Sequence, residues 1–397
     1  MDSLRTCKLF GVIRAVLGIK GALPLVHGPV GCFYHIKYLL SLRSSRPVRI
    51  LTTEMDQNDV VFGAEEKLAH KIKDADKTFS PQIIAVLTSC ASSIIGENFE
   101  KVADEIKGDV KADIICINAG GFEGTQIEGY EECLYSLIGV MEETEESGIK
   151  TNSVNLIGQY RGGPDLKTLR NCFERLEIDL NCVLTSGSTF QDIKNAPNAS
   201  LNVSMCEASG VGPCEMMEER FGIPFLHEVL PLGVRTTSNY FREICRVLNR
   251  NYTLIDDEKE ILGEINKVAL YLEGKRAIIV AGATRAIALT DFLCELGMNP
   301  VLICLDFAGK YTDSNLQRVI ERNQINPVVL KEAQYSDILN NAKDMDLDLV
   351  LGGMGEIGLS RELKIPLLDV MHAQEITLGF NGALALAKNI KEILKDN

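Results

Sequence analysis

Short apolar runs alternate with segments of helical spacing along nearly the whole chain. The runs are rich in Val, Ile and Leu, and most are followed by apolar residues spaced three and four positions apart. They occupy residues 22–26, 83–87, 114–117, 154–157, 183–185, 277–280, 301–304 and 347–351. Parallel strands buried on both faces give continuous apolar runs, and each needs a crossover connection, usually a helix. The pattern therefore predicts an α/β fold with doubly wound, Rossmann-like domains and parallel sheets.

Two segments have the character of joints between domains. Residues 142–152 are strongly charged and end a helical pattern. Residues 256–273 have the spacing of a long amphipathic helix, which Gly274 would end. The sequence therefore predicts three α/β domains, at residues 1–150, 151–270 and 271–397.

The composition is that of a globular protein with an acidic surface. The chain has 397 residues and 46% of them are apolar, enough to fill a core in each domain. Lys and Arg number 41 against 55 Asp and Glu, which gives a net charge of -14. No basic run interrupts this balance, so we expect neither nucleic acid nor a membrane as partner. No stretch is apolar enough for a signal peptide or a membrane span, so we expect a cytoplasmic protein.

The chain contains 12 cysteines. In a cytoplasmic protein thiols stay reduced, so metal binding or simple burial explains them better than disulfides. No CxxC pair occurs, which argues against a zinc ribbon or a thioredoxin-type site. A group of them lies within apolar strands or helical faces and is expected in the core, namely Cys116, Cys133, Cys172, Cys182, Cys245, Cys294 and Cys304.

Three other cysteines have a different setting. Cys32 and Cys90 each follow an apolar run and begin a helical pattern, and Cys7 lies in a short loop before another. A helix N-terminus favours the thiolate form. Gly28 and Gly31 precede Cys32 and would let the backbone approach a bulky ligand. Thiolates from three loops suit an iron-sulfur cluster, which also needs backbone amides near its sulfurs.

A set of segments over nearly the whole chain forms a more specific pattern. It comprises Cys7, the HGPVGC stretch ending at Cys32, residues 53–68 (TEMDQNDVVFGAEEKL), Cys90 with residues 94–97, and the segments 221–225, 274–276, 296–298 and 380–383. Together they resemble the nitrogenase component 1 family. That family includes dinitrogenase subunits, the NifE and NifN scaffold for cofactor assembly, protochlorophyllide reductase subunits and the nickel-tetrapyrrole reductive cyclase component CfbD.

The resemblance implies a fold, a cluster and partners. Three α/β domains would surround the metal sites, and Cys7, Cys32 and Cys90 would hold an iron-sulfur cluster of 4Fe-4S or P-cluster-like type at a subunit interface. A second component 1 subunit, NifN-like or NifK-like, or a second copy of this chain would complete that cluster. An ATP-hydrolysing, NifH-like iron-sulfur reductase would dock over this face and deliver electrons.

The resemblance also marks a second site. Cys206 lies where dinitrogenase and NifE carry the cysteine that holds their cofactor, although a buried core thiol is the alternative. His372 corresponds to the second cofactor ligand, or instead caps a loop. Gln126 matches a glutamine near the reacting face, but Tyr130 stands near where a histidine would fall, which disfavours nitrogen reduction because phenol is a poor proton shuttle. Arg285 would face an anionic cofactor or substrate, or else be a solvated charge.

A glycine-rich loop follows the last long apolar run. Gly353 and Gly355 belong to a GxGxxG pattern, which alone suggests a dinucleotide site with Glu375 as the ribose partner. The resemblance instead implies that the loop lets backbone approach a metallocofactor. The dinitrogenase lysine that holds the organic acid of its cofactor is missing here.

Three functions remain open from the sequence. The leading one is a NifE-like scaffold for metallocofactor assembly, with a second metallocluster at Cys206. Its rival is a reductase of the tetrapyrrole type, such as the CfbD component of Ni-sirohydrochlorin a,c-diamide reductive cyclase or a protochlorophyllide-reductase-like subunit, with a macrocycle in that pocket. A nitrogenase-like subunit that does not reduce dinitrogen, or a paralogue without turnover, is the third.

Overall fold

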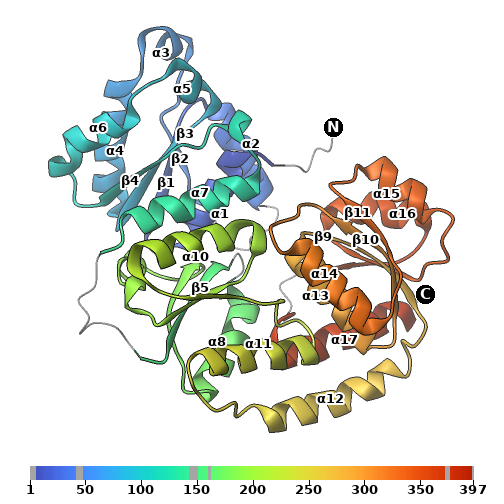
Figure 1. The fold of residues 1–397 in the computed structure, drawn as a ribbon. Coiled ribbons are helices and arrows are strands. Elements are labelled where there is room, and N and C mark those ends of the chain that lie inside the picture. The colour runs from blue at the N-terminus through green and yellow to red at the C-terminus, as the bar shows by residue number, and fades with distance from the viewer. Residues whose placement is uncertain (1–5, 42–47, 143–150, 160–161, 372–375, 396–397) are drawn as a thin grey trace.

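The computed structural model describes residues 6–41, 48–142, 151–159, 162–371 and 376–395. These residues form three sheets in which all paired strands run parallel, with helices packed around them (Figure 1). The predicted α/β fold with parallel sheets is therefore confirmed. The apolar runs explain this parallel arrangement: every residue of β3, for example, is buried, as expected of a strand covered on both faces.

The first sheet has the strand order β2-β1-β3-β4. Its strands are β1 (Ala22–His27), β2 (Leu51–Thr52), β3 (Ile83–Thr88) and β4 (Asp113–Ile117). The helices of this region are α1 (Lys8–Gly18), α2 (Val30–Ser41), α3 (Gln57–Phe62), α4 (Glu65–Phe79), α5 (Cys90–Ile95), α6 (Phe99–Ile106) and α7 (Gln126–Gly139). One face packs against α4 and α6 and the other against α1 and α7. Because β1 and β3 are neighbours, the turns that follow them meet at one edge of the sheet.

The second sheet has the order β6-β5-β7-β8. Its strands are β5 (Ser153–Gln159), β6 (Asp179–Thr185), β7 (Leu201–Ser204) and β8 (Phe225–His227). The helices are α8 (Gly163–Arg175), α9 (Phe190–Lys194), α10 (Glu207–Phe221), α11 (Val234–Val247) and α12 (Ile255–Ala269). The first and second regions meet where α7 lies beside α10 (Figure 1). Gly212 on α10 permits this approach, since a Cβ there would be 2.2 Å from the Tyr135 hydroxyl.

The third sheet has the order β11-β10-β9-β12-β13. Its strands are β9 (Arg276–Ala281), β10 (Asn299–Leu305), β11 (Val328–Lys331), β12 (Leu349–Gly352) and β13 (Leu367–Asp369). The helices are α13 (Ala283–Glu295), α14 (Thr312–Asn323), α15 (Tyr335–Ala342), α16 (Ile357–Leu363) and α17 (Gly379–Lys395).

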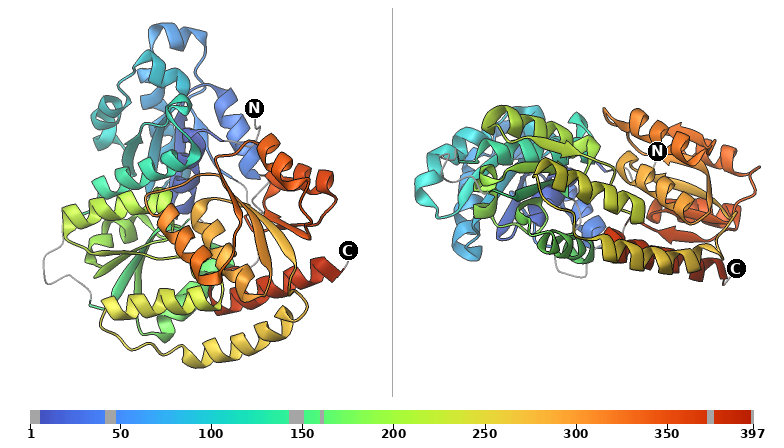
Figure 2. Two further views of the ribbon diagram at one scale, coloured as in Figure 1. Left: turned by 45° about the vertical axis from the view of Figure 1, so that its right-hand side comes forward. Right: turned by 60° about the horizontal axis from the view of Figure 1, so that its bottom comes forward.

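The last helix, α17, returns to the second region and packs against α8, α11 and α12 (Figure 2). Asp165 at the start of α8 anchors this return. Its buried carboxylate accepts the N–H groups of Thr377 (2.5 Å) and Leu378 (3.0 Å) and the Thr377 hydroxyl (2.9 Å). The boundaries near residues 150 and 270 stay a prediction, and most of the proposed joint at 142–152 lies outside the described residues.

In the described part of the chain, no helix combines the length and the apolar character needed to cross a bilayer.

Candidate metal centre

Three partly buried thiols come together at the carboxyl edge of the first sheet. Cys7 is the N-cap residue of α1, Cys32 lies in the first turn of α2 after β1, and Cys90 is the first residue of α5 after β3. A Cβ on Gly121 would lie 3.2 Å from the Sγ atoms of both Cys7 and Cys90. These two sulfurs are therefore within about twice that distance of each other.

Cys32 lies in the helix that follows β1, and Cys90 begins the helix that follows the neighbouring strand β3. Burial raises the pKa of Cys32, and the neighbouring Cys90 and Cys7 thiols raise this pKa further. Like charges at close range disfavour one another, so Cys32 lies near both of them. A cation at this point would remove the mutual repulsion of three thiolates.

The three thiols have the chemistry that an iron-sulfur cluster requires of its ligands. Among the described residues, no three His, Cys, Asp or Glu side chains are placed to hold one metal ion. The irons of a cluster each take their own thiolate, so its ligands need not converge on one point. The thiols and the adjoining Gly121 backbone are compatible with an iron-sulfur cluster, which Cys7, Cys32 and Cys90 would hold.

Close packing of α1 on α7 sets the position of Cys7. A Cβ on Gly11 would be 1.9 Å from the Gln126 carbonyl oxygen, and one on Gly129 would be 2.0 Å from the Lys8 carbonyl oxygen. The Gln126 N–H also donates to the Thr6 carbonyl at 3.1 Å. Gln126, predicted as catalytic, thus begins α7 beside the three-thiol site.

The loop that carries Cys32 is held by buried polar groups. Gly28 lies against Ser89, whose Oγ would be 2.3 Å from a Cβ, so packing of the chain on itself accounts for this glycine. By contrast, a Cβ on Gly31 would meet no described atom within 4 Å. The ring of His27 pairs with Thr53 at 3.0 Å and, through Nε2, with a carboxylate oxygen of Glu97 at 2.6 Å.

The sequence did not point to His27 and Glu97 as a pair. His27 is part of the quoted HGPVGC stretch, but nothing in the local pattern joins it to a residue 70 positions away. Burial lowers the pKa of His27, although the Glu97 carboxylate opposes this effect. Glu97 also accepts the N–H of Ala64, so it links α5, β1 and the start of α4.

Apolar side chains are exposed on the elements that carry or adjoin the thiols. α2 contributes Val30, Tyr34 and Tyr38, α3 contributes Val60, Val61 and Phe62, and Ile94 and Phe122 follow from α5 and the turn before α7. We call these residues the apolar rim. Exposed apolar groups of this kind are typical of surfaces that bind another molecule.

The second predicted site lies between the second and third sheets. Cys206 is buried, with 3% of its surface exposed, as the N-cap residue of α10. The N–H of Glu207, its neighbour, donates to the Thr284 hydroxyl at 3.0 Å. Because Arg285 follows Thr284, the structure brings the chain segments of Cys206 and Arg285 together. His372 lies outside the described residues.

Arg285 is held at this junction by a hydrogen-bonded chain. Its Nη1 donates to the Thr377 hydroxyl at 3.0 Å, and this hydroxyl donates to Asp165. Arg285 is therefore a half-buried, hydrogen-bonded side chain, and its role toward an anionic ligand stays a prediction.

His227 is a residue of this region that the sequence did not reveal. It ends β8, and its ring stacks on that of Tyr311 with 5.5 Å between centroids. Its Nδ1 is buried without a hydrogen-bond partner in the described part of the chain, and burial lowers the pKa to about 4. It is therefore neutral near pH 7.

Tyr130 belongs to the core. Its side chain is 1% exposed, and its hydroxyl lies 3.0 Å from the Thr185 hydroxyl and accepts the Thr185 N–H at 3.2 Å. Burial raises the pKa of this phenol. Tyr130 is therefore a hydrogen-bonded core residue of the folded chain.

The glycine loop after β12 is closed on itself. The Gly353 N–H donates to the carboxylate of Glu356 at 2.6 Å, and a Cβ on Gly352 would be 2.8 Å from that side chain. The helix that follows, α16, has only 7 residues. With its amide occupied, the loop that contains Gly353 and Gly355 does not have the geometry of a dinucleotide fingerprint.

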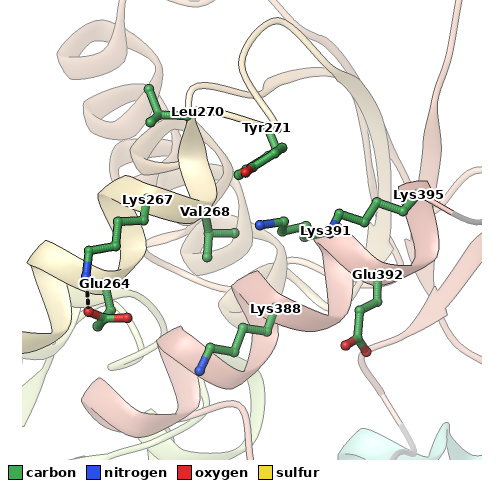
Figure 3. A pocket seen from close by; sticks show the side chains of 9 residues that line it. All are labelled: Glu264, Lys267, Val268, Leu270, Tyr271, Lys388, Lys391, Glu392 and Lys395. Carbon is green, nitrogen blue, oxygen red and sulfur yellow. Dashed lines mark hydrogen bonds and ion pairs between the residues drawn. The ribbon is translucent and has the colours of Figure 1, made fainter.

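A surface hollow of about 470 Å³ lies away from both sites, between α12 and α17 (Figure 3). Lysines gather around it, and Lys391 lies over the ring of Tyr271 with its Nζ 3.5 Å from the centroid. None of the residues that line this hollow belongs to the three-thiol site.

The fold and the thiols define a class of α/β protein: three parallel sheets with a cysteine-lined site at the edge of the first. The family model for nitrogenase component 1 type oxidoreductases matches residues 7–395, and the chain belongs to that family.

Several kinds of relatives are similar to this chain over most of their own length. The NifE cofactor biosynthesis protein of Clostridium pasteurianum is 29% identical and aligns over 98% of this chain and 87% of its own. The nitrogenase molybdenum-iron protein alpha chain of Methanothermobacter thermautotrophicus is 28% identical, over 97% and 87%. A solved structure titled nitrogenase Cp1 at pH 6.5 superposes with a TM-score of 0.89 at 21% identity, over 100% of this chain and 93% of that chain.

Proposed function

We propose that this chain is a NifE-like subunit that holds an iron-sulfur cluster and serves as a scaffold for metallocofactor assembly. The observation that carries the proposal is the meeting of Cys7, Cys32 and Cys90 at one edge of the first sheet. The similarity to NifE proteins supports the choice within the family.

When bound, the cluster would store and transfer electrons. Cys7, Cys32 and Cys90 bind it as thiolates, and the backbone at Gly121 is close enough to both Cys7 and Cys90 to shield their sulfurs from water. A partner completes the site: a NifN-like or NifK-like subunit, or a second copy of this chain, covers the apolar rim. A NifH-like, ATP-hydrolysing reductase then delivers electrons to this region.

The scaffold role depends on the second site. Cys206 would hold a metallocluster there, Arg285 would face its anionic part, and His372 would be the second ligand. Dinitrogen reduction is not proposed, because Tyr130 stands near where a histidine would serve as proton shuttle, and a phenol serves poorly at neutral pH. In the tetrapyrrole alternative, a macrocycle occupies this place and Cys206 is incidental.

Iron analysis tests the proposal. Anaerobically reconstituted protein should bind about four irons per interface cluster, with further iron at the second site. Cys32→Ala should abolish the brown chromophore and weaken assembly, because a cluster shared between chains contributes its binding free energy to association. The matched control is Cys182→Ala, a core thiol, which should keep both.

The outcomes separate the alternatives. Excess iron that disappears in Cys206→Ala supports the scaffold, whereas a wild-type protein with only the interface iron supports the tetrapyrrole reductase. Full absorbance and assembly in Cys32→Ala would contradict the cluster itself. Electron paramagnetic resonance with reduced NifH-like protein and ATP tests the electron input, and a signal that never changes would indicate a paralogue without turnover.

A further inference from the structure

A short turn at residues 120–123 lies directly against two of the three thiols; we call it the sulfur-facing turn. The Gly121 backbone is close to the sulfurs of Cys7 and Cys90, as its Cβ distances of 3.2 Å show. A hydrogen bond of 2.9 Å from the Glu123 N–H to the carbonyl three residues earlier closes the turn. Backbone so close to thiolates controls which N–H groups and which solvent molecules reach them.

Glu123 fastens this turn through both oxygens of its carboxylate. Oε2 is 3.3 Å from the Nζ of Lys8, the residue that follows the first thiol. Oε1 accepts a hydrogen bond of 3.3 Å from the Asn118 amide. The Asn118 oxygen in turn accepts hydrogen bonds from the hydroxyls of Thr88 (2.7 Å) and Ser93 (3.2 Å), which flank Cys90 in sequence.

The packing around Glu123 leaves the turn little freedom. A Cβ on Gly120 would be 2.7 Å from the Glu123 carboxylate and 2.8 Å from the Ser93 hydroxyl. Lys8 is 8% exposed, so its ammonium depends on carboxylate partners. Its other partner, Glu132 on α7, lies 3.4 Å away but outside the turn.

We propose that Glu123 is a positioning residue of the three-thiol site. By binding Lys8 on one side and Asn118 on the other, it holds the sulfur-facing turn against Cys7 and Cys90. Its effect on a bound cluster rests on the proposed function, whereas its effect on the free thiols does not.

Alkylation of metal-free protein under reducing conditions tests this directly, with iodoacetamide as the probe and peptide mass spectrometry as the readout. Glu123→Ala should speed the modification of Cys7 and Cys90 by about tenfold, since hydrogen bonds to a charged group are among the stronger ones that oppose local opening. Cys32 on α2 is the reference thiol. Glu132→Ala is the matched control, since it removes a carboxylate from Lys8 without touching the turn, and should change all rates by less than about twofold.

The proposal is overturned if Glu123→Ala keeps its circular dichroism spectrum and its alkylation rates at Cys7 and Cys90 stay within about twofold of wild type. Equal acceleration of Cys32 would also overturn it, since that indicates general loosening. If Glu123→Ala does not fold, Glu123→Gln decides: it keeps the shape but loses the charge, and should give an intermediate acceleration at the same two thiols. In cluster-loaded protein, Glu123→Gln should shift the midpoint potential more than Glu132→Gln. A wild type that binds no iron refutes the proposed function and leaves the alkylation result to decide the role of Glu123.

Discussion

A single methyl group at Gly129 should disrupt the three-thiol site from a distance. A Cβ there would lie 2.0 Å from the Lys8 carbonyl oxygen, whereas carbon and oxygen in close contact are roughly 3.3–3.6 Å apart. The obstacle is backbone of α1, so no side chain can rotate away. α7 and α1 must separate by more than about 1 Å, and this moves Cys7 away from Cys90.

The energetic cost follows from the same contacts. Overpacking a tight contact costs about 1–3 kcal/mol. Separation also strains two backbone hydrogen bonds, from Lys8 N–H to the Gly124 carbonyl (2.9 Å) and from Gln126 N–H to the Thr6 carbonyl (3.1 Å). At about 1 kcal/mol each, these bring the expected loss of stability in Gly129→Ala to roughly 3–5 kcal/mol.

Urea unfolding followed by circular dichroism measures this loss, and iron per chain after reconstitution measures the effect on the site. Gly139→Ala is the matched control in the same helix, because its Cβ would meet nothing within 4 Å. It should be neutral or stabilising by up to about 1 kcal/mol. A Gly129→Ala protein within about 0.5 kcal/mol of wild type and with full iron content would refute the view that the α1–α7 contact positions Cys7.

Three further changes have calculable effects. Asp165→Ala should lower the free energy of unfolding in urea by roughly 3–5 kcal/mol, because it leaves the buried N–H and hydroxyl of Thr377 without their carboxylate partner, and Asp165→Asn should cost less. An Asp165→Ala protein as stable as wild type would contradict the anchoring of α17. Tyr130→Phe should cost about 1–3 kcal/mol by removing the partner of the Thr185 N–H, yet leave iron binding intact; loss of iron with normal stability would contradict its assignment to the core. Burial raises the pKa of Cys182 to about 12 in the folded chain, so the free energy of unfolding falls as pH rises from about 8.5 towards 12. Cys182→Ala should reduce the slope of this fall by about 1.4 kcal/mol per pH unit, as measured by unfolding experiments between about pH 9.5 and 11. An unchanged slope would contradict the raised pKa.

Much of the fold was predictable because it follows from local pattern. Continuous apolar runs such as 83–87 became buried parallel strands, and the helix expected at 256–273 is α12. The positions of Cys32 and Cys90 after neighbouring strands also followed from the rule that strand ends of a parallel sheet share an edge. These inferences need only spacing and burial, which one sequence contains.

Other features depend on contacts between distant residues. Gly28 is expected from sequence to make room for a ligand, and its close contact with Ser89 appears only in the fold. Tyr130 was compared with a residue at a reacting face, although α7 turns its ring into the core against Thr185. Glu123 drew no attention, because its role appears only when the turn is folded between Lys8 and Asn118. No local pattern encodes which side of a helix will meet another domain.

The second site shows how such contacts combine. Glu207 accepts the Tyr311 N–H and, at 3.0 Å, the Thr312 hydroxyl, which ties the start of α10 to the loop before α14. Asp165 and Thr377 make a second tie between the second and third regions, and Thr377 also fixes Arg285. With ties on both sides, the chain segments that carry Cys206 and Arg285 are held in a fixed relation. A metallocluster or macrocycle bound there, as proposed, would meet segments already in place, and loss of either tie should weaken its binding before it unfolds the chain.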